Sequence, residues 1–169
     1  QGFAGALDKA LIKYPEVKYL SLYSGGGLVH EALLAVRILK DKDIITYVPK
    51  GGTCQSACGY IFLAGSERVL DGTLGAHGMS VEVEDELPLN VAYKHVQEAV
   101  GYIMAVLYPL DVPPGYYIRM LLTPSDGMYI FTEAEAEIIA TGVDNERFDH
   151  IDSLISIRIA YLTEVYGDE

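Results

Sequence analysis

Apolar and polar residues alternate along the chain with two different periods. Apolar positions spaced three and four residues apart predict amphipathic helices over residues 3–14, 28–39, 90–108, 116–122, 132–142 and 150–166. Short apolar runs rich in β-branched and aromatic residues predict strands over residues 17–22, 44–48, 68–70 and 73–77. A close-packed helix over residues 57–64 is predicted to end at Gly65. Helices that alternate with short strands are typical of an α/β domain with a mainly parallel sheet.

Length and charge narrow the class of protein. The 169 residues, half of them hydrophobic, predict one domain over residues 1–169 with a sizeable core. The 24 acidic and 12 basic residues give a formal net charge of −12, which argues against binding to nucleic acid or to an anionic membrane. The longest run without a charge or proline, over residues 99–108, is too short to cross a bilayer, so no membrane span is predicted.

Two glycine-rich turns follow the first two predicted strands, at residues 24–27 and 51–53. In parallel sheets the carboxyl ends of the strands are where ligands bind. The first turn lacks the dinucleotide fingerprint because His30 stands where its third glycine belongs, and the second lacks the lysine and hydroxyl of a phosphate-binding loop. No nucleotide cofactor is therefore predicted. Backbone N–H groups at such turns can stabilise a developing oxyanion.

A serine follows the second glycine-rich turn. Ser56 precedes the helix over residues 57–64 and has the small neighbours Ala57 and Gly59, so it is a candidate nucleophile if a base reaches it. Alternatively, Ser56 only caps that helix. His77, at the end of a predicted strand, is the candidate base, and Asp126 is placed in a loop from which it could orient an imidazole.

Three segments together resemble the proteolytic subunit of the Clp protease family. Residues 52–65, GTCQSACGYIFLAG, resemble its nucleophile segment, and residues 24–28, SGGGL, resemble its S-P-G-G-V oxyanion turn. Residues 132–144, TEAEAEIIATGVD, resemble its late helix, and the three segments occur in the family's order. Within the ClpP/crotonase superfamily, the C-x-S-x-C variant is most similar to ClpP-like proteins of the bacterial periplasm.

The resemblance implies a ClpP/crotonase-like ββα superhelix, whose first strand is missing from this chain. By position in the matched motifs it implies Ser56 as the nucleophile and His77 as the base, with the N–H groups of Gly26 and Ala57 forming the oxyanion hole. It also implies a homo-oligomer and an extracytoplasmic, periplasmic location.

The resemblance leaves alternatives for two residues of the implied site, the carboxylate that orients the imidazole and the general base. Asp126 is the candidate to orient the imidazole, with Asp111 and Asp144 as alternatives. The related signal-peptide peptidases pair serine with lysine, so Lys94 is the alternative base if burial lowers its pKa, although His77 is favoured.

The two cysteines flank the candidate nucleophile. Cys54 and Cys58 lack the second pair that a structural zinc site needs, so no metal is predicted. A disulfide between them could stiffen the nucleophile loop in an oxidising compartment. The alternative is that both are small buried hydrophobic residues.

The leading hypothesis is a serine hydrolase. It is a peptidase, ATP-independent or dependent on a partner, that acts on a peptide or protein through an acyl-enzyme on Ser56 and needs no cofactor. Two alternatives come from other classes. One is a crotonase-like acyl-thioester enzyme, although no basic cluster is available for coenzyme A. The other is a non-catalytic ClpP-like scaffold or binding protein.

Overall fold

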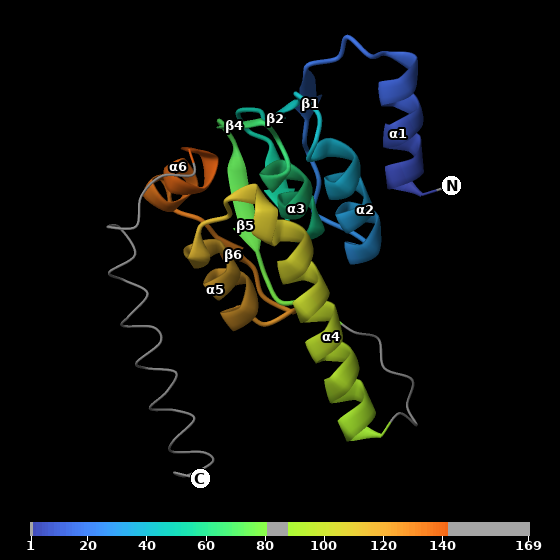
Figure 1. The fold of residues 1–169 in the computed structure, drawn as a ribbon. Helices are drawn as coiled ribbons and strands as arrows, with labels where there is room; N and C mark the ends of the chain where they lie inside the picture. Colours follow the sequence, from blue (N-terminus) through green and yellow to red (C-terminus); the bar gives the residue numbers. More distant parts are fainter. Residues whose placement is uncertain (1, 81–87, 142–169) are drawn as a thin grey trace.

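Helices surround two small sheets in this computed structural model, which describes residues 2–80 and 88–141 (Figure 1). The helices are α1 (Phe3–Lys13), α2 (Val29–Leu39), α3 (Ala57–Leu63), α4 (Leu89–Leu107), α5 (Pro114–Leu122) and α6 (Glu133–Thr141), with a short 3-10 helix η1 (Tyr108–Leu110) after α4. The strands are β1 (Tyr19–Ser21), β2 (Ile45–Val48), β3 (Thr53–Gln55), β4 (Glu67–Leu70), β5 (Thr73–Ala76) and β6 (Tyr129–Ile130).

The strands form two three-stranded sheets, in the orders β1-β2-β4 and β3-β5-β6. Every pairing in the first sheet is parallel, and so is the β3–β5 pairing. Only β6 runs antiparallel, against β5. The prediction of an α/β fold with a mainly parallel sheet is therefore confirmed. The strands on either side of the Asp71-Gly72 turn do not pair with each other, because β4 pairs with β2 and β5 pairs with β3.

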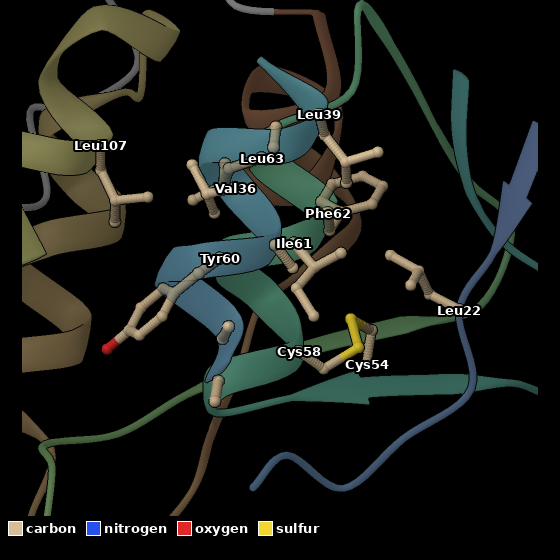
Figure 2. Close-up of a cluster of buried hydrophobic side chains, with 14 of the residues drawn as sticks. Leu22, Val36, Leu39, Cys54, Cys58, Tyr60, Ile61, Phe62, Leu63 and Leu107 are labelled. Carbon is tan, nitrogen blue, oxygen red and sulfur yellow. A yellow bond between two sulfur atoms is a disulfide. The ribbon is translucent and has the colours of Figure 1, made fainter. Parts of the chain in front are cut away.

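Helix α3 lies at the centre of the core. All seven of its residues are buried, and its contacts reach α2 and both sheets. Phe62 and Leu63 are fully buried beside Val36 and Leu39 of α2, and Leu107 of α4 reaches the same cluster (Figure 2). Burying such side chains contributes about 1.5–3 kcal/mol each, so the core fixes the position of α3 firmly.

Helix α4 is the longest described helix and the least covered one. Ile103 and Leu107, near its carboxyl end, are its buried residues, and its amino-terminal half extends beyond the rest of the described chain in Figure 1. Within residues 2–80 and 88–141, no helix combines the length and the apolar character needed to span a membrane.

Most of the predicted elements are present within one or two residues of their predicted bounds. The predicted strand over residues 17–22 is shorter, because only residues 19–21 pair. Strands β3 and β6 were not predicted, since two or three residues show no periodicity. The capping box that opens α6 is present, with Thr132 Oγ1 accepting the Glu135 N–H at 3.3 Å. The predicted terminal helix over residues 150–166 lies outside the described residues.

Candidate active site

The first glycine-rich turn lies against strand β3. The Ser24 N–H donates to the carbonyl of Thr53 at 2.8 Å, and the Gln55 N–H donates to the carbonyl of Ser24 at 3.0 Å. These bonds continue the direction of β1 as a parallel bridge between Ser24 and Cys54. The turn is therefore held beside the carboxyl end of β3, where the sheet geometry places ligands.

The carboxyl ends of β3 and β5 bring the candidate nucleophile and base to the same edge. Gln55 is opposite Gly75 in the parallel register, and the Ser56 N–H donates to the Gly75 carbonyl at 3.0 Å. Ser56 is the first residue after β3, and His77 is the first residue after β5. The two residues thus leave neighbouring strands at one edge of the sheet.

Ser56 has an unusual backbone conformation. Its φ of 54° and ψ of −128° lie in a region that residues other than glycine seldom occupy, at a typical cost of about 1–3 kcal/mol. Its side chain makes no capping hydrogen bond to α3, so the capping alternative is not what the structure shows. A serine on a sharp strand-to-helix turn, held with φ above zero, matches the geometry that exposes a nucleophilic hydroxyl in α/β hydrolases.

Gly26 lies directly against Ser56. A Cβ atom added to Gly26 would lie 2.7 Å from Ser56 Cβ, 3.2 Å from Ser56 Oγ and 2.9 Å from the Gln55 carbonyl oxygen. Gly26 also has a φ of +112°, which favours glycine. A Cβ atom added to Gly25, by contrast, would meet no atom within 4 Å. The second glycine of the turn is therefore needed for the close approach to the serine, and the first is not.

The two candidate oxyanion donors differ in their present partners. The Ala57 N–H begins α3, so it has no partner within the helix and is available to a ligand. The Gly26 N–H donates to Ser24 Oγ at 3.1 Å, and the Ser24 hydroxyl in turn donates to the Gly26 carbonyl at 3.2 Å. An oxyanion would have to displace one neutral hydroxyl to use the Gly26 N–H.

His77 is close to the turn that carries Asp126, but its side chain has no partner there. The Gly78 N–H donates to the Thr123 carbonyl at 2.8 Å, which places the turn beside the histidine. His77 Nδ1 is buried and has no hydrogen-bond partner in the described parts of the chain. Within those parts, no hydrogen bond or ion pair joins His77 to Ser56 or to Asp126, whose side chain is exposed.

The alternative candidates have other surroundings. Lys94 lies on an exposed face of α4, where its ammonium pairs with Glu98 at 3.7 Å. Asp111 has a left-handed backbone conformation after η1. Burial lowers the pKa of the Arg68 guanidinium, and the charge of the nearby Asp111 carboxylate opposes part of that lowering. Asp144 lies outside the described residues.

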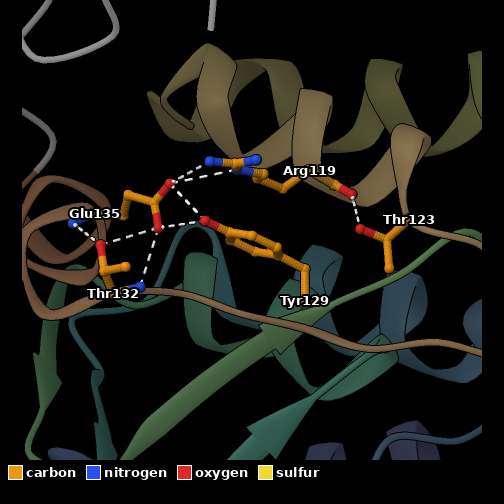
Figure 3. A network of polar contacts seen from close by, with 5 residues as sticks. All are labelled: Arg119, Thr123, Tyr129, Thr132 and Glu135. Atoms are coloured by element: carbon orange, nitrogen blue, oxygen red, sulfur yellow. Dashed lines mark hydrogen bonds and ion pairs between the residues drawn. The ribbon is translucent and has the colours of Figure 1, made fainter. Parts of the chain in front are cut away.

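A polar network fastens β6 to α5 and α6 beside this edge (Figure 3). The Glu135 carboxylate accepts hydrogen bonds from the Arg119 guanidinium at 3.0 Å, from the Tyr129 hydroxyl at 2.9 Å and from the Thr132 N–H at 3.0 Å. Burial raises the pKa of Glu135, but bonds from these three residues outweigh burial and hold the pKa below its usual value. Because β6 pairs with β5, the network steadies the strand that leads to His77.

A cavity of about 430 Å³ adjoins the candidate oxyanion donors. Gly26, Gly27, Ala57 and Cys58 line one side of it, and mostly apolar side chains of α1, β1, α2 and α3 line the rest. Within the described residues, no group of three or more histidine, cysteine or acidic side chains could hold a metal ion.

The cysteines beside Ser56 are joined in the structure. A disulfide links Cys54 to Cys58, whose Cα atoms are 5.3 Å apart, and both residues are buried (Figure 2).

One structural contact beside the site could not be predicted from the sequence. Tyr116 of α5 is fully buried, and its hydroxyl is packed against Gly59 in the first turn of α3, where a Cβ would be. This hydroxyl has no hydrogen-bond partner in the described residues. Nothing in the local sequence around Tyr116 indicates this contact, because its partner is 57 residues away (116 − 59).

Comparisons with known proteins identify the fold. No family model matches the sequence, and no curated protein matches it either. The structure is similar to a ClpP1 mutant from Listeria monocytogenes, with a TM-score of 0.56 and 17% identity over 81% of this chain and 80% of that chain.

The structure is also similar to the 1510-N membrane-bound stomatin-specific protease. A lysine-to-alanine mutant in complex with a substrate peptide gives a TM-score of 0.55 and 18% identity, over 81% of this chain and 64% of that chain. A serine-to-alanine mutant gives a TM-score of 0.52 and 17% identity, over 81% of this chain and 68% of that chain. The chain therefore has a ClpP-like fold, and the sequence prediction of this fold is confirmed.

Proposed function

We propose that the protein is a serine hydrolase, and specifically a peptidase that acts through an acyl-enzyme on Ser56. The observation that carries this proposal is the backbone of Ser56. The residue has a φ of 54° at a strand-to-helix junction, and its side chain makes no capping bond to the helix. The close approach of Gly26 supports it, since a glycine turn beside the serine can supply an oxyanion donor. Similarity to ClpP1 and to a protease captured with a substrate peptide supports peptide or protein substrates.

In the proposed reaction, His77 accepts the Ser56 proton while Oγ attacks the carbonyl carbon of the scissile peptide bond. The Ala57 N–H stabilises the oxyanion, and the Gly26 N–H joins it when the Ser24 hydroxyl rotates away. Collapse of the tetrahedral intermediate breaks the C–N bond, and His77 returns the proton to the leaving amine. Water then attacks the ester with His77 again as base, which releases the acid and regenerates Ser56.

Asp126 is proposed to orient His77 through Nδ1. The backbone bond between Gly78 and Thr123 supports this assignment, because it holds the turn that carries Asp126 beside the residue that follows His77. Catalytic hydrogen bonds are often long before substrate binds and tighten in the Michaelis complex.

Labelling with a fluorophosphonate probe tests the proposal. We expect one adduct on Ser56 by peptide mass spectrometry, and no adduct on the Ser56→Ala variant. A matched pair of glycine variants tests the geometry: Gly26→Ala places a methyl group against Ser56 and should lower the labelling rate about 100-fold, whereas Gly25→Ala meets open space. Absence of any Ser56 adduct in folded protein would refute the proposal.

The identity of the base is tested separately. His77→Ala should lower the labelling rate by about 10²–10⁴-fold, the usual contribution of a general base. Lys94→Ala should leave the rate unchanged, since the ammonium is exposed and paired with Glu98. The reverse result would assign the base role to Lys94.

We also propose that the protein is a homo-oligomer in an extracytoplasmic compartment. ClpP-like folds typically form oligomers, and a disulfide beside the candidate nucleophile suits an oxidising compartment. Light scattering of the purified chain tests the first statement, and a thiol count on protein extracted under alkylating conditions tests the second.

One observation keeps a non-catalytic scaffold as the second candidate. In the described residues His77 makes no hydrogen bond to Ser56, which is also what a ClpP-like fold kept for assembly alone would present. An oligomeric protein whose Ser56 is inert to the probe would favour this candidate.

A further inference from the structure

The disulfide encloses the candidate nucleophile in a short covalent ring. Cys54 is the middle residue of β3 and Cys58 is the second residue of α3, so the ring contains Gln55, Ser56 and Ala57. It thus includes both the residue with the strained backbone and the N–H that is free to bind an oxyanion. The disulfide therefore adds a second covalent link between β3 and α3 to the one that the main chain makes through Ser56.

Two backbone hydrogen bonds and the close approach of Gly26 surround Ser56 in its strained conformation. The Ser56 N–H donates to the Gly75 carbonyl at 3.0 Å, and its carbonyl accepts the Gly59 N–H at 2.9 Å. Its side chain makes no capping bond. A residue keeps a rarely populated backbone conformation only when several surrounding contacts hold it there. The disulfide adds a covalent restraint on the same three residues.

The bond is buried but can be reached from the candidate site. Cys54 is fully buried and Cys58 is 4% exposed. Cys58 nevertheless lines the cavity of about 430 Å³ together with Gly26, Gly27 and Ala57. Figure 2 shows the two sulfur atoms at the edge of the apolar cluster, next to Leu22. The cavity is therefore the side from which a small thiol could approach Cys58.

We propose that the Cys54–Cys58 disulfide positions the nucleophile, and that its reduction switches the candidate site to a low-activity state. The proposal rests on the proposed function of Ser56. A thiolate of a dithiol reductant attacks Cys58 Sγ, the S–S bond breaks, and Cys54 leaves as a thiolate that takes a proton. The second thiol of the reductant then attacks the mixed disulfide, which releases Cys58 as a thiol and leaves the reductant as its cyclic disulfide.

The consequence lies in the geometry of Ser56. Without the ring, Ser56 can relax toward an ordinary φ, which turns Oγ and the Ala57 N–H away from the positions in which they act together. A misplacement of about 1 Å in a reacting group lowers rates by about 100-fold. The site would then respond to the thiol redox state of its compartment.

The experiment compares the oxidised chain with the same chain after treatment with dithiothreitol. Labelling of Ser56 by the fluorophosphonate probe is followed by intact mass, free thiols are counted in parallel, and circular dichroism confirms that the reduced protein stays folded. We expect a fall of about ten-fold or more in the labelling rate on reduction, with recovery after reoxidation by glutathione disulfide. The Cys54→Ala/Cys58→Ala variant is the matched control, and it should label slowly whether or not dithiothreitol is present.

The outcomes separate this inference from the proposed function. Equal labelling of the oxidised protein and of folded protein with two free thiols would overturn the inference and leave the proposed function standing. If neither form labels, the proposed function fails, and amide hydrogen exchange over residues 56–59 decides the inference alone. Faster exchange on reduction would then support a positioning role for the disulfide, and unchanged protection would overturn it.

Discussion

Because Gly59 packs against the Tyr116 hydroxyl, we expect Gly59→Ala to destabilise the wild-type protein but not the Tyr116→Phe variant. Replacing a helical glycine by alanine ordinarily stabilises a protein by about 1 kcal/mol. At Gly59 the added Cβ would overlap the hydroxyl oxygen of Tyr116. The Tyr116 ring cannot withdraw easily, because it is fully buried and stacked on Phe131 with centroids 5.4 Å apart. Overpacking of this kind costs about 1–3 kcal/mol, and the helix gain of about 1 kcal/mol offsets part of it, so Gly59→Ala should be destabilising by up to about 2 kcal/mol overall.

The Tyr116→Phe substitution removes the overlapping atom and keeps the stacked ring. In that background the nearest remaining ring carbon would be 3.4 Å from the added Cβ, so Gly59→Ala should become neutral or stabilising by up to about 1 kcal/mol. Tyr116→Phe alone should also stabilise the protein by about 1 kcal/mol, because a buried hydroxyl without a partner carries its full desolvation cost.

Urea unfolding of the wild type, the two single variants and the double variant measures the coupling energy directly. In thermal unfolding, each 1 kcal/mol corresponds to a shift of about 2–4 °C for a chain of this size. Two results would refute the reasoning. An equal cost of Gly59→Ala in both backgrounds would show that the Tyr116 hydroxyl is not the obstacle. A loss of more than 1 kcal/mol in Tyr116→Phe would show that this hydroxyl has a hydrogen-bond partner.

Three further predictions concern polar groups that connect the elements. Arg68→Met removes a guanidinium that donates to backbone carbonyls at the ends of η1 and α6, so urea unfolding should show a loss of about 2–3 kcal/mol. Thr46→Val removes the buried bond to the Phe62 carbonyl at 2.7 Å, and should cost about 1–2 kcal/mol by the same measurement, whereas Thr46→Ser keeps the donor. Glu135→Gln should lower stability at pH 7, and the gap to the wild type should close in thermal unfolding as the pH falls. The folded-state pKa of Glu135 is depressed, so its carboxylate stabilises the protein above the unfolded pKa and loses that effect as pH falls through the folded pKa.

Features set by a few neighbouring residues could be predicted from the sequence. The stripe of α2 and the capping box of Thr132 and Glu135 each depend on side chains within one or two helical turns. The placement of Ser56 between a glycine-rich turn and the start of a helix also follows from local composition, since Gly51 and Gly52 precede it and small residues follow it. For the same reason the helix bounds agree to within one or two residues.

Features set by distant residues could not be predicted. Strand β3 exists because Thr53 and Gln55 find partners in β5 and in the Ser24 turn, neither of which their own sequence indicates. Strands β4 and β5 likewise lie in different sheets because β4 pairs with β2 and β5 pairs with β3, and neither pairing is indicated by the residues of β4 and β5 themselves. The two sheets therefore emerge only when all the strands are placed together.

The backbone of Ser56 shows where local preference and tertiary structure disagree. A serine before a helix ordinarily takes an extended conformation and accepts a hydrogen bond from the helix, which stabilises the protein by about 1 kcal/mol. Here the Ser56 side chain makes no such bond, and the residue has a strained backbone with a φ of 54°. Its conformation is therefore less favourable in free energy than that of an ordinary helix cap. Instead of a capping bond, Ser56 has Gly26 packed against its side chain and the Cys54–Cys58 disulfide closed around its turn.

A strained residue of this kind persists when other parts of the fold hold it in place, and in natural proteins such residues are concentrated at functional sites. The strain at Ser56 is therefore a stronger argument for the proposed nucleophile than the resemblance of the surrounding letters, because it would be the first feature to relax if the residue had only a structural role.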